Sequence, residues 1–268
     1  MKTRKEKPHH AAALAISLYA TPREFTDDNL RGTVAVVIDV LRSSSTIAAA
    51  VASGAREVIP VSTPAEAGEL AMRAGRDATL LCGERDGRRI EGFDLGNSPV
   101  EYTPDRVAGR TLVFASTNGS PVMVRVRTSD RVFVGGFNNF SAVVANILAA
   151  AKPVAILCSG RLEQFSYEDF VCGGKFVAAL QSQWSGTAEL NDAARAAAEL
   201  FQTLHGDISR VLRESTHGKY LASIGFESDL DFCAQVDSLP VVPMLVEGKI
   251  KGLRPDGTPL GEPAIAAA

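Results

Sequence analysis

The stretch Thr33-Val-Ala-Val-Val-Ile-Asp39 decides the fold class. Its near-continuous run of β-branched residues is typical of a strand that is buried on both faces, as in a parallel sheet. The hydroxyl run Ser43-Ser-Ser-Thr46 follows and offers N-cap side chains for an alanine-rich helix that ends at Gly54. These residues predict a buried strand that leads directly into a helix.

The same alternation continues through most of the chain. Strands are expected at residues 57–61, 78–82, 111–116, 131–134 and 153–158, and helices at residues 64–75, 120–127, 139–151, 167–183 and 192–204. The tail then turns irregular and ends in a hairpin at residues 241–246 and 249–253. Strands that alternate with helices predict an α/β fold with a mostly parallel sheet and helices on both faces. In such folds ligands bind beyond the carboxyl ends of the strands.

Length and charge limit the classes of protein that fit. The 268 residues have ordinary globular composition, with 46% hydrophobic and 22% charged residues. We expect one domain over residues 1–268, with a short flexible N-terminal segment (1–12) and a C-terminal tail (255–268). The net charge of -3 argues against general electrostatic binding to nucleic acid.

The N-terminus allows two interpretations. Basic residues 2–7 precede the apolar run 11–20, which resembles a short signal peptide. The run is rich in alanine and weakly hydrophobic, so we favour a first strand at Leu14–Tyr19. Elsewhere no apolar segment approaches the ~20 residues of a membrane span, so no membrane partner is expected.

The cysteines indicate a reducing compartment. Cys82, Cys158, Cys172 and Cys233 lie among apolar or small residues, and none is spaced as C-x-x-C. This pattern favours buried free thiols over a zinc site or a catalytic cysteine. We therefore expect a cytoplasmic protein.

Four strand ends carry polar groups that could form a site. They are Asp39 with Arg42 and the hydroxyl run, the charged loop 83–99, the segment 116–120, and the segment 159–169. A helix N-terminus beside an arginine suits a phosphate or sulfonate, although a capped helix with a surface arginine explains the first segment equally well. Loop 83–99 is too long and charged for a simple connector, and Ile90, Phe93 and Leu95 could pin it to the body. In segment 159–169, Glu168 and Asp169 could reach a divalent cation, but stabilisation of a first helical turn is the slightly better explanation.

Several common site motifs are missing. The sequence has no G-x-x-x-x-G-K-[ST], no strand–G-x-G-x-x-G–helix and no G-x-S-x-G. Asp39 has no second aspartate two residues on, so the paired-aspartate signature of aspartyl-phosphate phosphatases is missing too. The remaining interpretation is an oxygen-rich and arginine-rich site without histidine, which suits a small polyanion bound with Mg²⁺.

These motifs together resemble the 2-phosphosulfolactate phosphatase (ComB) family. The matching segments are Val37-Ile-Asp-Val-Leu-Arg-Ser-Ser-Ser-Thr-Ile47, Gly83-Glu-Arg85, Gly92-Phe-Asp-Leu-Gly-Asn-Ser-Pro99 and Thr117-Asn-Gly119. The match continues with Ser159-Gly160, Phe165-Ser166, Glu168-Asp169 and the stretch 233–243, so the resemblance spans roughly residues 14 to 250. It implies a three-layer α/β/α fold with a mixed sheet. It also implies a Mg²⁺-dependent phosphatase that hydrolyses 2-phospho-3-sulfolactate to 3-sulfolactate and phosphate, a step of coenzyme M biosynthesis. The triple serine 43–45 departs from the alanine and threonine that are frequent in the family, but it leaves the helix N-terminus intact.

From these residues we predict the following site. Asp39 is the first choice for metal ligation, or alternatively a phosphoryl acceptor, and Arg42 and Arg85 are expected to be exposed substrate clamps. The full set is catalytic Asp39, Arg42, Glu84 and Arg85; substrate-binding Ser43, Ser44, Ser45, Thr46, Asn97, Asn118, Gly119 and Ser166; and metal-ligating Asp39, Glu84 and Asp94. The expected partner is a small anionic phosphorylated substrate, and a homodimer is possible. The alternatives are a phosphatase for another small phosphorylated acid and a non-catalytic anion-binding module.

Overall fold

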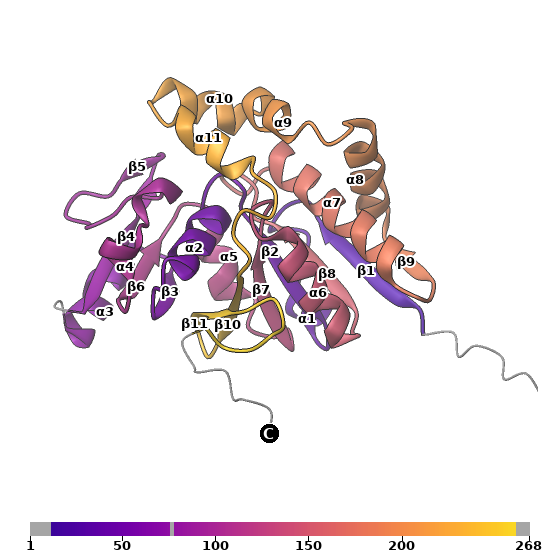
Figure 1. Ribbon diagram of the computed structural model, residues 1–268, viewed down its shortest axis with the longest axis horizontal. Coiled ribbons are helices and arrows are strands. Elements are labelled where there is room, and N and C mark those ends of the chain that lie inside the picture. Colours follow the sequence, from indigo (N-terminus) through magenta and orange to yellow (C-terminus); the bar gives the residue numbers. More distant parts are fainter. Residues whose placement is uncertain (1–11, 76–77, 261–268) are drawn as a thin grey trace, which may run out of the picture.

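One mixed sheet of eleven strands runs through the residues that the computed structural model describes, 12–75 and 78–260 (Figure 1). The strands are β1 (Leu14–Tyr19), β2 (Val34–Ile38), β3 (Glu57–Val61), β4 (Thr79–Arg85), β5 (Arg88–Arg89), β6 (Thr111–Ala115), β7 (Arg131–Gly135), β8 (Val154–Cys158), β9 (Ala188–Leu190), β10 (Val242–Val246) and β11 (Lys249–Leu253). The helices are α1 (Asp27–Leu30), α2 (Ser43–Ala52), α3 (Pro64–Ala74), the 3₁₀ helix η1 (Pro99–Glu101), α4 (Pro104–Val107), α5 (Gly119–Arg125), α6 (Phe140–Ala150), α7 (Tyr167–Gln183), α8 (Asp192–Thr203), α9 (Ile208–Glu214), α10 (Thr216–Ser223) and α11 (Glu227–Cys233).

The sheet consists of two parallel blocks joined by a hairpin. Its order is β5-β4-β6-β3-β11-β10-β7-β2-β8-β1-β9. Strands β4, β6 and β3 are parallel to one another, as are β7, β2, β8, β1 and β9. The hairpin β10–β11 pairs antiparallel with β7 on one side and β3 on the other. The prediction of a three-layer α/β/α fold with a mostly parallel, mixed sheet is confirmed.

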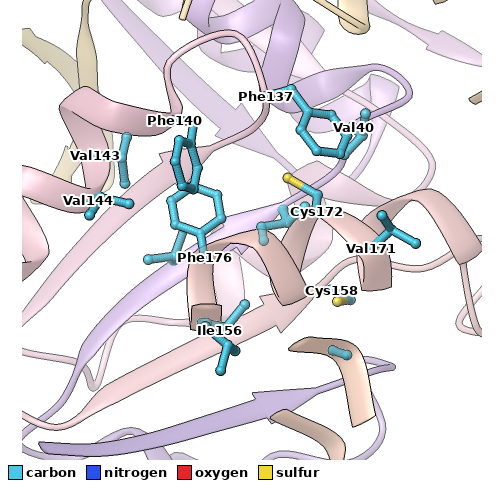
Figure 2. Packing of buried hydrophobic residues seen from close by; sticks show 14 of the residues in the cluster. Val40, Phe137, Phe140, Val143, Val144, Ile156, Cys158, Val171, Cys172 and Phe176 are labelled. Atoms are coloured by element: carbon cyan, nitrogen blue, oxygen red, sulfur yellow. The ribbon is translucent and has the colours of Figure 1, made fainter. Parts of the chain in front are cut away.

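Strand β2 shows why the sheet is covered on both faces. All five of its residues are buried. Val34, Val36 and Ile38 pack in a cluster with α6 and α7, whereas Ala35 and Val37 pack in a second cluster with α2 and α5. In the first cluster the rings of Phe140 (α6) and Phe176 (α7) meet edge to face with centroids 4.9 Å apart (Figure 2). The β-branched run is therefore a central strand with a hydrophobic layer on each side.

The helix predictions hold along most of the chain, with two corrections. Helix α3 begins after Thr63, whose hydroxyl accepts the Glu66 N–H, and the limits of α7 are as predicted. The serines 43–45 are not N-caps, because the N-cap residue of α2 is Arg42 and the hydroxyls lie inside the first turn. The segment expected to be irregular instead forms α9, α10 and α11, which lie above α2 and α7 in Figure 1.

Loop 83–99 is ordered as its apolar residues suggested. Leu95 is buried, and Ile90 and Phe93 pack against a small cluster formed by β3, β6 and α3. The loop therefore lies fixed against the body of the protein.

The two ends of the chain are described only in part. Leu14–Tyr19 is strand β1, as predicted. In the predicted tail, residues 255–260 hydrogen-bond back to the body, through Asn146 to the Pro255 carbonyl and through the Leu260 N–H to the Gly252 carbonyl. Residues 1–11 and 261–268 of the two predicted flexible ends lie outside the described residues. Across the described part of the chain, the longest helices are too short or too polar to cross a bilayer.

The four cysteines are free and buried, as expected. Burial raises the pKa of Cys82, Cys158 and Cys172 well above the ordinary thiol range. A thiol that resists ionisation is a poor nucleophile, so these cysteines are structural.

Candidate active site

A small cavity lies where the segments that follow β2, β4 and β6 meet. Its volume is about 20 Å³, which is room for about one water molecule. The residues that line it are Asp39, Leu41, Arg42, Glu84, Gly87, Asn97, Asn118 and His217. The structure thus brings together five residues that the sequence had nominated from three of the four strand-end segments: Asp39, Arg42, Glu84, Asn97 and Asn118.

Asp39 follows the last residue of β2 and is buried, with 3% of its surface exposed. The Ser43 N–H donates to its Oδ1 at 3.4 Å, and the Asp39 N–H donates to Ser44 Oγ at 2.9 Å. Burial raises the pKa of this carboxyl to about 6; Ser43 and the charge of His217 lower it, while Glu84 raises it further. Burial makes ionisation of this carboxyl costly in free energy, and carboxyls with such raised pKa values are typical of functional sites.

The start of α5 approaches Asp39 closely because residue 119 is glycine. A Cβ at Gly119 would lie 2.6 Å from Asp39 Oδ2 and 2.8 Å from the Ser43 Cβ. Real Cβ atoms do not come this close to other heavy atoms, so a side chain here would push α5 away. Gly119 therefore lets the start of α5 pack directly against Asp39, which lines the cavity.

Glu84 fastens the end of β4 to the end of β6. Its Oε1 accepts the Thr117 N–H at 2.7 Å, and its Oε2 accepts the Gly87 N–H at 2.9 Å and the Thr117 hydroxyl at 3.2 Å. Both carboxylate oxygens are thus engaged within the protein. The contacts suit a side chain that positions two loops beside Asp39.

Arg42 is buried, which corrects the expectation of an exposed clamp. Only 2% of its surface is exposed, and its guanidinium pairs with Asp229 of α11 at 2.7 Å. It also donates to the Gly87 carbonyl at 2.5 Å and lies over the Phe226 ring at 4.3 Å. Asp229 in turn accepts the Ser98 hydroxyl at 2.6 Å. Arg42 therefore joins α11 to the loop after β4 while it lines the cavity.

His217 of α10 corrects the expectation of a site without histidine. It lines the cavity, and its Nδ1 lies 3.5 Å from Glu168 Oε1 at the start of α7. Burial raises the pKa of Glu168, but the hydrogen bond and charge of His217 outweigh burial and leave this pKa below its ordinary value. No spacing in the sequence links His217 to Asp39, so only the fold places it here.

Asp169 connects two strand ends. Its Oδ1 accepts the Val40 N–H at 2.8 Å, and its Oδ2 accepts the Gly160 N–H at 3.0 Å. Burial raises its pKa well above the ordinary range, and the nearby Glu168 and Asp39 carboxylates raise it further. Because both oxygens bind backbone, the contacts favour a structural role over cation binding.

The remaining predicted residues divide into three groups. The hydroxyls of the first turn of α2 lie directly behind the cavity: Ser43 accepts from Asn97 Nδ2 at 3.4 Å, and Thr46 donates to the Asn97 carbonyl at 2.9 Å. Ser44 and Ser45 donate to the Val37 and Val40 carbonyls. Ser166 lines a neighbouring pocket.

The third group lies away from the cavity. Arg85 donates to the Glu84 and Ser62 carbonyls, and Asp94 accepts the Leu81 N–H at 2.7 Å. Neither side chain lines the cavity. The fold therefore does not bring these two residues to Asp39.

Asp39 and Asn97 line the cavity and carry side-chain oxygens that could hold a metal ion. Asn97 Oδ1 is buried and has no hydrogen-bond partner, so the cavity contains an oxygen that a cation would satisfy. No group of three His, Cys, Asp or Glu side chains with ligand geometry occurs in residues 12–75 and 78–260. Since Mg²⁺ is bound through oxygen atoms and takes one or two protein carboxylates, this oxygen set fits Mg²⁺.

A larger groove of about 940 Å³ lies at the start of β7, lined among others by Arg131 and Met244. It contains none of the residues that the sequence nominated. The cavity at Asp39 is therefore the candidate active site on chemical grounds.

Comparison with known proteins identifies the family of this chain. The family model of 2-phosphosulpholactate phosphatase matches residues 19–248, which include every residue that lines the cavity. The chain belongs to the 2-phosphosulpholactate phosphatase family. The resemblance inferred from the sequence motifs is confirmed.

Three relatives each align with 80% or more of this chain. A protein of Thermotoga petrophila is 41% identical over 214 residues, 80% of this chain and 89% of its own length. One of Caldanaerobacter subterraneus subsp. tengcongensis is 36% identical over 236 residues (88% and 97%), and one of Symbiobacterium thermophilum is 40% identical over 223 residues (83% and 95%). Each is named "Probable 2-phosphosulfolactate phosphatase".

Proposed function

We propose that this protein is a Mg²⁺-dependent phosphatase that hydrolyses 2-phospho-3-sulfolactate to 3-sulfolactate and phosphate, a step of coenzyme M biosynthesis. The observation that carries the proposal is the family match over residues 19–248, which includes the cavity around Asp39. Three of the relatives carry the name of this activity.

The side chains of the cavity suit phosphoryl transfer. Such a reaction depends mainly on positioning and on stabilisation of charge, so few reactive groups are needed. Asp39 and Asn97 would hold the metal ion, with Asp39 as the anionic ligand. Bound Mg²⁺ supplies positive charge that offsets the negative charge of the phosphoryl oxygens.

His217 is placed to act on the leaving group. When the ester P–O bond breaks, the oxygen on C2 of sulfolactate must gain a proton. Glu168 holds one ring nitrogen of His217, and the histidine lines the cavity beside Asp39. We assign the protonated imidazole as the donor of that proton.

Release of phosphate tests the proposal. Purified protein is incubated with 2-phospho-3-sulfolactate and Mg²⁺, with EDTA in place of Mg²⁺, and with a panel of other small phosphorylated acids. We expect turnover that requires Mg²⁺ and is fastest with phosphosulfolactate. Absence of phosphate release from every substrate would refute the phosphatase, and metal-independent binding without turnover would support an anion-binding module instead. Trapping of a phosphorylated Asp39 would show that this carboxylate attacks phosphorus rather than binding metal.

The proposal extends to location and assembly. A cytoplasmic location is supported by the four free, buried thiols, which persist in a reducing compartment. A homodimer is proposed because closed symmetric oligomers are common among soluble enzymes. Light scattering on the purified protein would decide between a dimer and a monomer.

A further inference from the structure

A second pocket opens beside the cavity and shares His217 with it. It has a volume of about 410 Å³ and lies between the loop after β8 and the start of α10. Its polar residues include Arg161, Ser166, Glu168 and His217. We refer to it as the Arg161 pocket.

The guanidinium of Arg161 is held in place but has free donors. It lies over the Tyr220 ring at 5.0 Å, and the Tyr220 hydroxyl donates to the Asp86 carbonyl at 3.0 Å. Throughout the described chain, no protein acceptor pairs with this guanidinium. Stacking uses the face of a guanidinium and leaves its N–H edge for a ligand.

Ser166 provides a second, independent sign of a ligand. Ser166 has 5% of its surface exposed, and its Oγ makes no hydrogen bond of standard geometry, although it lies near enough to Glu168 to help lower the pKa of that carboxyl. A buried hydroxyl without a partner costs free energy, and a bound ligand oxygen would remove that cost. Glu168, the carboxylate that lines this pocket, is paired with His217.

The other arginines near the site are already engaged. Arg42 pairs with Asp229 and Gly87, as described above. A further pocket of about 410 Å³ shares Asn118 with the cavity, but its Arg125 donates to the Pro22 and Phe25 carbonyls. Arg161 is therefore the arginine beside the cavity that is best able to bind a second anionic group.

We propose that the Arg161 pocket binds the sulfonate of the substrate and that Arg161 determines specificity for it; this inference rests on the proposed function. In 2-phospho-3-sulfolactate the sulfonate sulfur lies two bonds from the phosphate-bearing C2, whereas the carboxylate carbon lies one bond from it. The sulfonate is thus the anion that extends farthest from the phosphate and into a neighbouring pocket. A guanidinium edge donates two parallel N–H bonds to such oxygens, with the Ser166 hydroxyl as a further donor.

The test compares two substrates that differ in the sulfonate. The kcat and KM values for 2-phospho-3-sulfolactate and for 2-phospholactate are measured with the wild type, Arg161→Gln and the control Arg88→Gln. Arg88 is an exposed arginine on β5 that lines neither pocket. We expect Arg161→Gln to raise KM for phosphosulfolactate roughly tenfold or more, the usual scale for a hydrogen bond to a charged group, while its kinetics with 2-phospholactate and those of Arg88→Gln stay unchanged.

The outcomes separate this inference from the proposed function. An equal loss with both substrates, or unchanged kinetics with both, would overturn the sulfonate assignment while the phosphatase stands. If the wild type turned over neither substrate, the proposed function would fail. Calorimetric titration with 3-sulfolactate would then test whether the Arg161 pocket binds a sulfonate. If 3-sulfolactate binds the wild type and Arg161→Gln weakens this binding roughly tenfold, the sulfonate assignment is supported. Equal binding to both proteins, or no binding to the wild type, would overturn it. An unchanged thermal midpoint for Arg161→Gln shows that the variant is folded.

Discussion

Replacement of Asp39 by asparagine should abolish activity and at the same time stabilise the metal-free protein. Burial raises the pKa of Asp39 from 3.8 to about 6. Because the folded state binds this proton more tightly than the unfolded chain, the ionised carboxylate destabilises the fold above pH 6, and the cost disappears as the pH falls from 6 to 3.8. A difference of roughly two pKa units corresponds to about 3 kcal/mol at neutral pH, which a neutral asparagine would recover.

Urea unfolding in EDTA measures this effect. At a pH about 1.5 units above the folded pKa, we expect Asp39→Asn to raise the free energy of unfolding by about 3 kcal/mol. This gain in stability should become small near about pH 4, where Asp39 is mostly protonated in the folded wild type. Mg²⁺ should stabilise the wild type but not the variant, since only the carboxylate binds the ion strongly. The control Asp130→Asn, which removes an exposed pairing with Lys152, should leave stability nearly unchanged. A variant less stable than the wild type at neutral pH in EDTA would refute the reasoning, because Asp39 would then be a structural anchor.

Three further predictions concern the walls of the cavity. His217→Gln should lower kcat by about 100-fold for phosphosulfolactate but far less for p-nitrophenyl phosphate, whose leaving group needs no proton; equal losses for both would exclude the proton-donor role. Arg42→Gln should destabilise the fold by about 3 kcal/mol or more in urea unfolding, because it leaves Asp229 buried and unpaired. Adding Asp229→Asn should restore part of the lost stability, and an unchanged stability of Arg42→Gln would show that the ion pair contributes nothing. Gly119→Ala should lower kcat/KM roughly tenfold by displacing α5 from Asp39, whereas the control Gly68→Ala, at a helical position with open space around it, should leave kinetics unchanged; normal kinetics in both would mean that the cavity tolerates the methyl group.

The strands could be predicted because their apolar runs are strong local signals. Val34–Ile38 and Val154–Cys158 are buried at every position, so their sequences are continuous β-branched and aliphatic runs. The place of the hairpin β10–β11 could not be predicted in this way. Its insertion between β3 and β7 depends on pairs such as Ile250 with Val58 and Met244 with Phe133, which are far apart in the sequence.

The three late helices were missed for a different reason. α9, α10 and α11 have seven, eight and seven residues, about two turns each, which is too short for a clear helical period. Their side-chain caps, Asp207 for α9 and Ser215 for α10, were the local signals that could have revealed two of them.

Five of the eight residues that line the cavity could be nominated from the sequence, whereas the contributions of the late helices depend on the fold. Asp39, Glu84 and Asn97 could be nominated because polar residues at strand ends gather at one edge of an α/β sheet. Asp229 and His217 come from the late helices, and Asp229 reaches Arg42 across 187 positions of sequence. A surface position for Arg42 was expected because its partner lies on an element that the sequence did not reveal.

The central claim is that the cavity around Asp39 is the centre of a phosphatase for 2-phospho-3-sulfolactate. Phosphorus NMR on a mixture of the purified protein, the substrate and Mg²⁺ follows the ester and the released phosphate directly. We expect the ester signal to be replaced by that of inorganic phosphate with the wild type, and to persist with folded Asp39→Asn. An ester signal that persists with the wild type, or that disappears equally fast with Asp39→Asn, would contradict the claim.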